Sequence, residues 1–354
     1  MIRYATIRGK PFSTQTIRDA ILADEAGHLD PEVRKDVKDW QKKADDRTAQ
    51  LIAIGEYLDL EKWNRLSAAR KSLVAKPLSL SWSSIKYLFM ELQNDKCAYC
   101  ERKLAAASSK GGPGETDVDH FRPKNPVKKW PTPKRIGFAT GDSADPGYYW
   151  LAFHLLNYCT ACPTCNSGHK SNYFPILGTR IGPGHEPCPR ADAIEQPLLI
   201  YPLGTTDEDP EDVIRFRGLA AEPPERDPLL MEADRSHVLR NRRAVVIIAF
   251  YQLNSRVELL WGRAERLREL EKALGDLNKG TSAEKLAAKA DIQRLMCGFS
   301  EHTACIRAMV RLYRHDHATA RLYFDAIRKY LDSKTPKDYR DHAGQFVQKP
   351  RSRN

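Results

Sequence analysis

The sequence predicts an α+β protein, a mainly helical chain with an embedded zinc-stapled module. Three observations lead to this prediction. Helical periodicity is clear before residue 95 and again after about residue 205, it fades between them, and two C-x2-C pairs occur in the interval. We therefore expect an N-terminal helical region at 1–95, a metal-containing module at 96–205 and a C-terminal helical region at 206–354.

The N-terminal region carries two helix signals. Asp30 followed by Pro31 is typical of a helix start, because aspartate caps the first turn and proline fits the first helical position. The stretch SSIKYLFMELQNDK spaces its apolar residues as one helical face. Those residues are Ile85, Leu88, Phe89 and Leu92.

The C-terminal region predicts several longer helices. One apolar stripe at helical spacing consists of Val257, Leu260, Ala264, Leu267 and Leu274. Thr281 with Glu284 is typical of a capping box that opens the next helix. Residues 305–331 predict a further long helix or a helix pair. The acidic stretch DEDPED, residues 207–212, predicts a loop and a boundary.

Bulk composition restricts the class of protein. With 41% hydrophobic and 29% charged residues the chain is typical of soluble globular proteins. The longest apolar run, residues 244–250, is far too short to cross a membrane, and no apolar segment follows the basic start MIRYATIRGK. We expect a cytoplasmic protein without a membrane partner, in which the eight cysteines are metal ligands or buried thiols rather than disulfides.

The charge indicates nucleic acid as a partner. The formal net charge is +11, and residues 96–135 contain ten basic and four acidic side chains. Because the same segment carries the metal-ligand candidates, a nucleic-acid-binding role is favoured over a merely solvated face.

Four cysteines have the spacing of a structural zinc site. The two knuckles Cys97–Cys100 and Cys162–Cys165 can complete a tetrahedron of thiolates around one ion. Cys159 lies three residues before Cys162 and is an alternative ligand to it. An iron–sulfur cluster is disfavoured, because the fourth position of a ferredoxin run holds a histidine here, His169.

Between and after the knuckles lie groups suited to phosphodiester hydrolysis. His120 can act as a general base near neutral pH, and Asp119 can hold a divalent ion. Adjacent strand residues point to opposite faces, so we expect a local twist or bulge that lets both serve one site. Asn166 follows the second knuckle directly and offers an amide oxygen suited to Mg²⁺. Three cations nearby are predicted to contact phosphates: Arg122, Lys124 and Lys170.

The order C-x2-C, D-H, an asparagine in LLNYC, and C-x2-C-N-x3-K resembles the HNH, or ββα-metal, endonucleases. The resemblance implies that Asp119 and Asn166 bind a catalytic Mg²⁺ or Mn²⁺ ion and that His120 is the general base. It also implies that Asn157 is the middle asparagine, which braces the loop carrying the base. Many relatives have histidine at the position of Asn166.

The motifs KCAYCE, VDHFRPK, YYWLAF, CPTCN, FPILG and EQPLLIYP, within residues 85–205, resemble the PtuB-type HNH nucleases of Septu and some retron anti-phage systems. This resemblance implies a defence nuclease held in complex with an AAA/ABC-like ATPase partner of the PtuA type. DNA is favoured over RNA as substrate, and we expect the partner to supply the trigger. The alternative is a non-catalytic zinc-stapled nucleic-acid-binding or adaptor protein, for which zinc and positive charge suffice.

Overall fold

The computed structural model describes residues 1–24, 39–73, 82–104, 116–224 and 235–332. The chain divides into two units. We call the first the hairpin unit, made of Tyr4–Asp95 and Leu104–Glu208, and the second the helical unit, made of Met1–Arg3, Lys96–Lys103 and the chain from Asp209 onward. The described residues are mainly helical and contain three two-stranded sheets, which agrees with the predicted α+β class.

The hairpin unit combines short strands, short helices and long irregular connections. Its strands are β1 (Thr6–Ile7), β2 (Lys10–Pro11), β3 (Asp117–His120) and β4 (Tyr158–Ala161). Its α-helices are α1 (Thr14–Ala23), α3 (Trp40–Ile54), α4 (Leu60–Arg65), α5 (Ala68–Lys71), α6 (Lys86–Leu92) and α7 (Pro189–Glu195). Its single turns are η2 (Trp82–Ile85), η3 (Lys134–Ile136), η4 (Tyr149–Leu151), η5 (Leu155–Asn157) and the π-type turn η6 (Thr164–Lys170).

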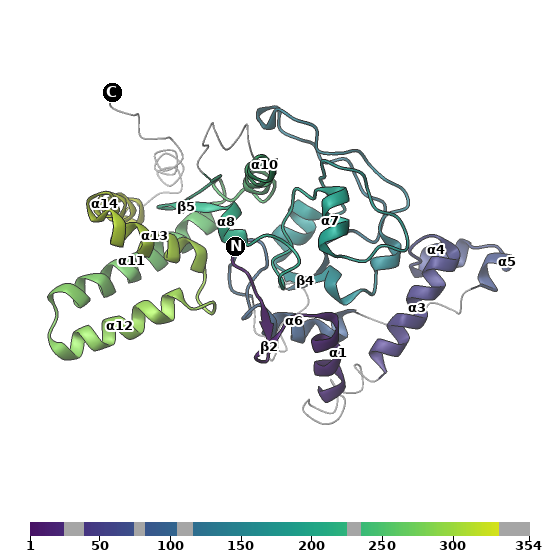
Figure 1. Cartoon of the computed structure of the whole chain (residues 1–354), viewed down its shortest axis with the longest axis horizontal. Coiled ribbons are helices and arrows are strands. Elements are labelled where there is room, and N and C mark those ends of the chain that lie inside the picture. Colours follow the sequence, from purple (N-terminus) through teal and green to yellow (C-terminus); the bar gives the residue numbers. More distant parts are fainter. Residues whose placement is uncertain (25–38, 74–81, 105–115, 225–234, 333–354) are drawn as a thin grey trace. The chain divides into compact units, whose positions relative to one another are not determined.

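The helical unit contains the long helices, and Figure 1 shows α11 and α12 running side by side. Its elements are α8 (Pro210–Val213), β5 (Arg215–Arg217), β6 (Ala220–Glu222), α10 (Arg235–Phe250), α11 (Val257–Lys279), α12 (Ser282–Met296), α13 (Thr303–His315) and α14 (His317–Asp332). Helices α11, α13 and α14 enclose one apolar core with Leu219 and Ala220 of the β5–β6 hairpin.

The helix predictions from apolar spacing are confirmed where the structure describes them. In α6 the residues Leu88, Phe89 and Leu92 are buried, and four of the five residues predicted for the α11 stripe are buried. Thr281 and Glu284 form the predicted capping box of α12, and residues 303–332 form a helix pair. The helix start expected at Asp30 and Pro31 lies outside the described residues.

The acidic stretch 207–212 is only in part the loop that its composition predicts, because residues 207–209 are non-helical and a helix begins at Pro210. Residues Pro210–Val213 form the short helix α8. The Asp209 carboxylate accepts a hydrogen bond from the Glu211 amide, and Pro210 occupies the first turn, so the same residues supply a helix start. The division between the two units does fall here, after Glu208.

Among the residues that the structure describes, no helix combines the length and the apolar character needed to span a bilayer.

Candidate functional site

The candidate site lies on the antiparallel hairpin formed by β3 and β4. The ladder pairs Asp119 with Cys159 and His120 with Tyr158. One residue further on, the amide of Phe121 donates to the carbonyl of Asn157, which extends the pairing beyond the strand end. Turn η6 follows β4 after two residues, so sequence-distant groups on β3 and η6 lie next to each other.

The His120 ring is fixed on several sides. Its Nε2 lies 3.0 Å from the carbonyl oxygen of Ala152. The rings of Trp82 and Tyr158 lie edge-on to it, at 4.8 and 5.1 Å between centroids. The Tyr158 hydroxyl donates to the same Ala152 oxygen at 2.6 Å, and this carbonyl therefore accepts two hydrogen bonds.

This environment defines the protonation of His120. Burial, the main cause, holds the pKa of the imidazole well below its ordinary value, and the nearby Lys124 charge acts in the same direction. The ring is therefore neutral at neutral pH. A carbonyl oxygen can only accept, so Nε2 carries the hydrogen and the lone pair lies on Nδ1. That nitrogen is the one able to accept a proton.

Asn157 braces the chain that follows His120. Its side-chain oxygen accepts a hydrogen bond from the Arg122 amide at 2.8 Å. Its side-chain nitrogen donates to the carbonyls of Arg122 and Leu151 at 3.0 and 3.1 Å. The side chain is fully buried, and three hydrogen bonds hold it. Asn157 thereby ties the backbone at Arg122 to that at Leu151.

The buried Asp119 carboxylate contacts Lys170. The Lys170 ammonium donates to Asp119 Oδ1 at 2.9 Å and to the carbonyl of His120 at 2.6 Å. The Cys159 thiol lies 4.0 Å from Asp119 Oδ2. Lys170 is fully buried, so it connects η6 to β3 rather than facing solvent, where a phosphate contact was expected.

Asn166 contacts an acid that sequence reasoning missed. Its amide nitrogen donates to Asp117 Oδ2 at 3.0 Å, and the Ser167 hydroxyl lies 3.4 Å from the same oxygen. Asp117 precedes Asp119 by two residues, so both carboxylates occupy one face of β3. The alternation D-x-D in TDVDH was the signal that could have identified Asp117.

The bulge expected between Asp119 and His120 does not occur, because the β3–β4 register is continuous through both residues. The two side chains accordingly have separate partners: Asp119 contacts Lys170 and Cys159, while His120 contacts Ala152 and two aromatic rings. The carboxylates of Asp117 and Asp119 with the Asn166 amide are oxygen donors of the kind that Mg²⁺ prefers. In the structure these donors bond to one another and to Lys170.

Arg122 is buried in an ionic network. Its guanidinium donates to Glu195 at 2.7 Å and to Asp192 at 2.6 Å, both on α7. The Tyr148 hydroxyl and the Ile181 amide also donate hydrogen bonds to the Glu195 carboxylate. The side chain is 2% exposed, so it does not present the phosphate contact that its sequence position predicts. It instead ties the loop after His120 to α7.

Lys124, the third predicted phosphate contact, lies on an aromatic surface. Its ammonium is 4.4 Å from the ring centroid of Trp82 and 5.1 Å from that of Tyr57. Burial lowers the pKa of Lys124 to about 8, against the opposing effect of the Asp119 charge. Because Trp82 also touches His120, Lys124 is the predicted cation that lies beside the histidine and remains partly exposed.

The four predicted cysteines form a cluster that can hold a zinc ion. The sulfur atoms of Cys97, Cys100, Cys162 and Cys165 all lie within 4.8 Å of one another, and all four residues are buried. Thiolates bound tetrahedrally at a Zn–S distance of about 2.3 Å are about 3.8 Å apart, so the cluster fits this ion. Cys159 is outside the cluster and lies beside Asp119.

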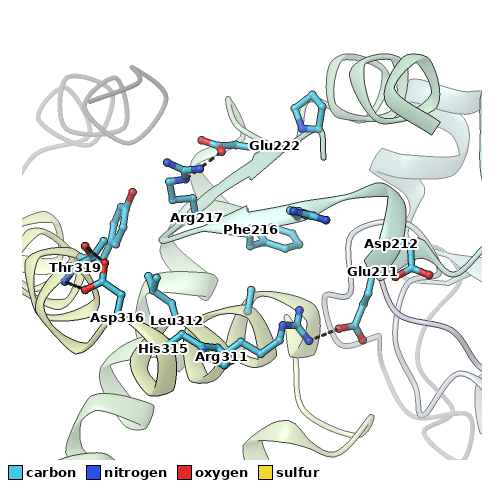
Figure 2. Close-up of a pocket in the computed structure, with 14 residues that line it drawn as sticks. Glu211, Asp212, Phe216, Arg217, Glu222, Arg311, Leu312, His315, Asp316 and Thr319 are labelled. Carbon is cyan, nitrogen blue, oxygen red and sulfur yellow. Dashed lines mark hydrogen bonds and ion pairs between the residues drawn. The ribbon is translucent and has the colours of Figure 1, made fainter. Parts of the chain in front are cut away.

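A separate cavity of about 880 Å³ lies in the helical unit, between the β5–β6 hairpin and helices α13 and α14 (Figure 2). Its charged groups are largely paired with one another. Arg311 contacts Glu211 at 3.4 Å and Arg217 contacts Glu222 at 3.3 Å. Among the described residues, the cysteine cluster is the group with metal-ligand geometry, and this cavity has none.

Comparison with known proteins identifies one region of this chain as homologous to the Septu protein PtuB of Bacillus mycoides (strain KBAB4), at 30% identity over 160 residues. The matched region covers 44% of this chain and 48% of that protein, so the chain spans about half the length of this curated relative. This similarity supports a PtuB-like protein, whereas the HNH character that the motifs resemble stays a prediction. No family model matches, and no solved structure does.

Proposed function

We propose that this chain is a metal-dependent HNH-type endonuclease that hydrolyses phosphodiester bonds of nucleic acid as a component of a Septu anti-phage system. The observation that carries the proposal is the His120 arrangement: a neutral imidazole whose Nε2 donates to the Ala152 carbonyl, followed by a backbone that Asn157 braces. The same chain contains a cysteine cluster that can hold zinc. The homology to PtuB supports the defence role.

The proposed mechanism assigns a separate task to each group. His120 Nδ1 takes a proton from the attacking water, while the bond from Nε2 to Ala152 fixes the ring orientation. Asp119 and Asn166, together with Asp117, would hold Mg²⁺ or Mn²⁺, which stabilises charge on the leaving oxygen when bound. Binding at Asp119 requires its oxygens to be shared with, or released by, Lys170. Because Asp119 and His120 alternate across a strand without a bulge, the end of β3 must also twist on substrate binding for both side chains to act on one phosphodiester.

The nuclease is tested by cleavage of plasmid DNA and of RNA with Mg²⁺ or Mn²⁺, comparing the natural chain with His120→Ala. We expect His120→Ala to reduce the rate at least 100-fold, the range for removal of a general base. His185→Ala is the control, because the His185 side chain is exposed and its ring contacts the nearby Gly182 carbonyl, while the bond from Trp150 goes to the His185 backbone and is kept. Cleavage by His120→Ala at the natural rate, with zinc content unchanged, would remove His120 from the mechanism, and no cleavage by any of the three proteins would favour a binding or adaptor role.

The pH profile of cleavage gives a second test of the same group. Because the pKa of His120 is lowered, its neutral, proton-accepting form persists as the pH falls below 6.5. We expect cleavage to be retained at pH 6 and to disappear only at more acidic pH. A rate that follows a group titrating above 7 would contradict His120 as the base.

We further propose an ATPase partner of the PtuA type that activates cleavage. This proposal rests on the PtuB homology. Cleavage by the purified chain alone should be slower than cleavage by the complex with that partner. Equal rates for the chain and the complex would show that the partner does not supply the trigger.

A further inference from the structure

We infer that residues 128–135, KKWPTPKR, form the surface that binds the phosphodiester backbone of nucleic acid next to the candidate site. We call this segment the basic loop. The inference deepens the proposed function and rests on it for the nature of the substrate. It differs from the expected phosphate contacts, which fall on residues that the fold buries or places against rings.

The solvent-exposed positive charge of this region is concentrated in the basic loop. Of the basic side chains in residues 96–135, Lys96 and Arg122 are buried, and Lys124 lies against two rings. The basic loop, in contrast, has four exposed cations and no acidic residue. These are Lys128, Lys129, Lys134 and Arg135.

One of these four cations is already paired with a carboxylate. Lys129 pairs with Asp142 at 2.7 Å, and both side chains are largely exposed. Lys128, Lys134 and Arg135 have no ion-pair partner in the part of the chain that the structure describes. Three unpaired cations within eight residues suit a run of phosphates, whose charge repeats along the strand.

The basic loop is held in place by backbone hydrogen bonds, buried side chains and two prolines. Its start is held by paired backbone bonds between Val127 and Ala144, at 2.8 and 3.0 Å. The side chains of Trp130 and Ile136 are buried, and they hold the basic loop against the protein interior. Pro131 and Pro133 restrict the backbone between these anchors. The cations are therefore displayed on an ordered loop, so binding orders little additional backbone.

Backbone hydrogen bonds connect the basic loop to the segment that contacts the candidate site. The Lys128 amide donates to the Asn172 carbonyl at 3.0 Å, and the Tyr173 amide donates to the Lys170 carbonyl at 2.8 Å. Lys170 in turn bonds to Asp119 and to the carbonyl of His120. The basic loop is thus joined through two short backbone links to the hairpin that carries the histidine. Phosphates flanking the scissile bond can bind here.

The test replaces the three unpaired cations together, as Lys128→Gln, Lys134→Gln and Arg135→Gln, in the full chain. The matched control removes the same charge from exposed lysines of α11 and α12, as Lys272→Gln, Lys285→Gln and Lys289→Gln. Binding of labelled DNA and RNA of one sequence is measured by fluorescence anisotropy over a salt series without added divalent ion. Polyglutamate serves as a competing polyanion that is not nucleic acid.

We expect the loop variant to bind at least 10-fold more weakly, with the salt slope reduced by about 2 to 3, because each phosphate that a cation no longer neutralises lowers the slope by about one. The control variant should bind like the natural chain. The DNA and RNA arms identify which backbone is preferred. The inference is overturned by equal weakening in both variants, by unchanged binding in the loop variant, by no binding to either nucleic acid, or by equally effective competition from polyglutamate.

The same proteins separate this inference from the nuclease proposal. If no protein cleaves either nucleic acid while the loop variant binds poorly, the nuclease assignment falls and the basic loop stands. If cleavage depends on His120 while the loop variant binds normally, only the loop inference falls. All six substitutions are at exposed positions, so we expect both triple variants to fold. Circular dichroism and zinc analysis check that each variant is folded.

Discussion

At the residue scale, the charged groups around the histidine divide into structural and functional sets. Sequence position made Arg122, Lys124 and Lys170 equivalent candidates for phosphate binding. Burial separates them: Arg122 and Lys170 each pair with buried or partly buried carboxylates, while Lys124 keeps partial exposure beside His120. A buried cation with acidic partners stabilises local structure, and its removal leaves charges without compensation.

Arg122→Ala tests this division. The variant leaves the fully buried Glu195 without its cation, so we expect a decrease of about 3 to 5 kcal/mol in the free energy of unfolding. Lys129→Ala removes an exposed pair with Asp142 and should leave the free energy of unfolding nearly unchanged. Urea unfolding of both variants gives the comparison. If Arg122→Ala were as stable as Lys129→Ala, the structural role of Arg122 would be wrong.

At the element scale, close packing decides what composition leaves open. Glycine has the same low helix propensity at every interior helical position, yet the two glycines of α11 have different surroundings. A Cβ at Gly262 would lie 2.7 Å from Nε2 of the buried His302, whereas a Cβ at Gly275 would meet nothing within 4 Å. Gly262 is therefore required by the packing of its helix, and Gly275 is not.

This difference predicts opposite signs for the same substitution in one helix. Gly275→Ala should raise the free energy of unfolding by about 0.5 to 1 kcal/mol, because alanine favours the helix and causes no clash. Gly262→Ala should lower it by about 1 to 3 kcal/mol, because His302 must move. Thermal unfolding of the two variants measures both. Equal shifts would mean that the contact with His302 does not constrain α11.

At the scale of the whole molecule, the cysteine cluster joins segments about sixty residues apart in a region with little regular structure. Two C-x2-C pairs predicted the ligand set but did not distinguish Cys159 from Cys162. The structure places Cys162 in the cluster and Cys159 on β4 facing Asp119. A zinc ion bound at this cluster would contribute its binding free energy to the folding of this region.

Metal removal is therefore expected to destabilise the protein. We predict one zinc per chain by elemental analysis, and release of the ion with a large decrease in melting temperature on treatment with a strong chelator. Cys162→Ser should lower zinc affinity sharply, while Cys159→Ser should retain one zinc. Zinc loss in Cys159→Ser together with retention in Cys162→Ser would reverse the ligand assignment.

Several features of this protein can be predicted from local spacing along the chain alone. The α11 stripe, the capping box at Thr281, the two cysteine knuckles and the motifs shared with PtuB-type proteins follow from residue type and separation along the chain. Tertiary folding, in contrast, settles which charged side chains are buried. It paired Asn166 with Asp117, Asp119 with Lys170 and Arg122 with α7, and left the cations of the basic loop exposed. The physical reason is that a side chain's partners and dielectric environment come from segments distant in sequence, and local spacing does not encode them.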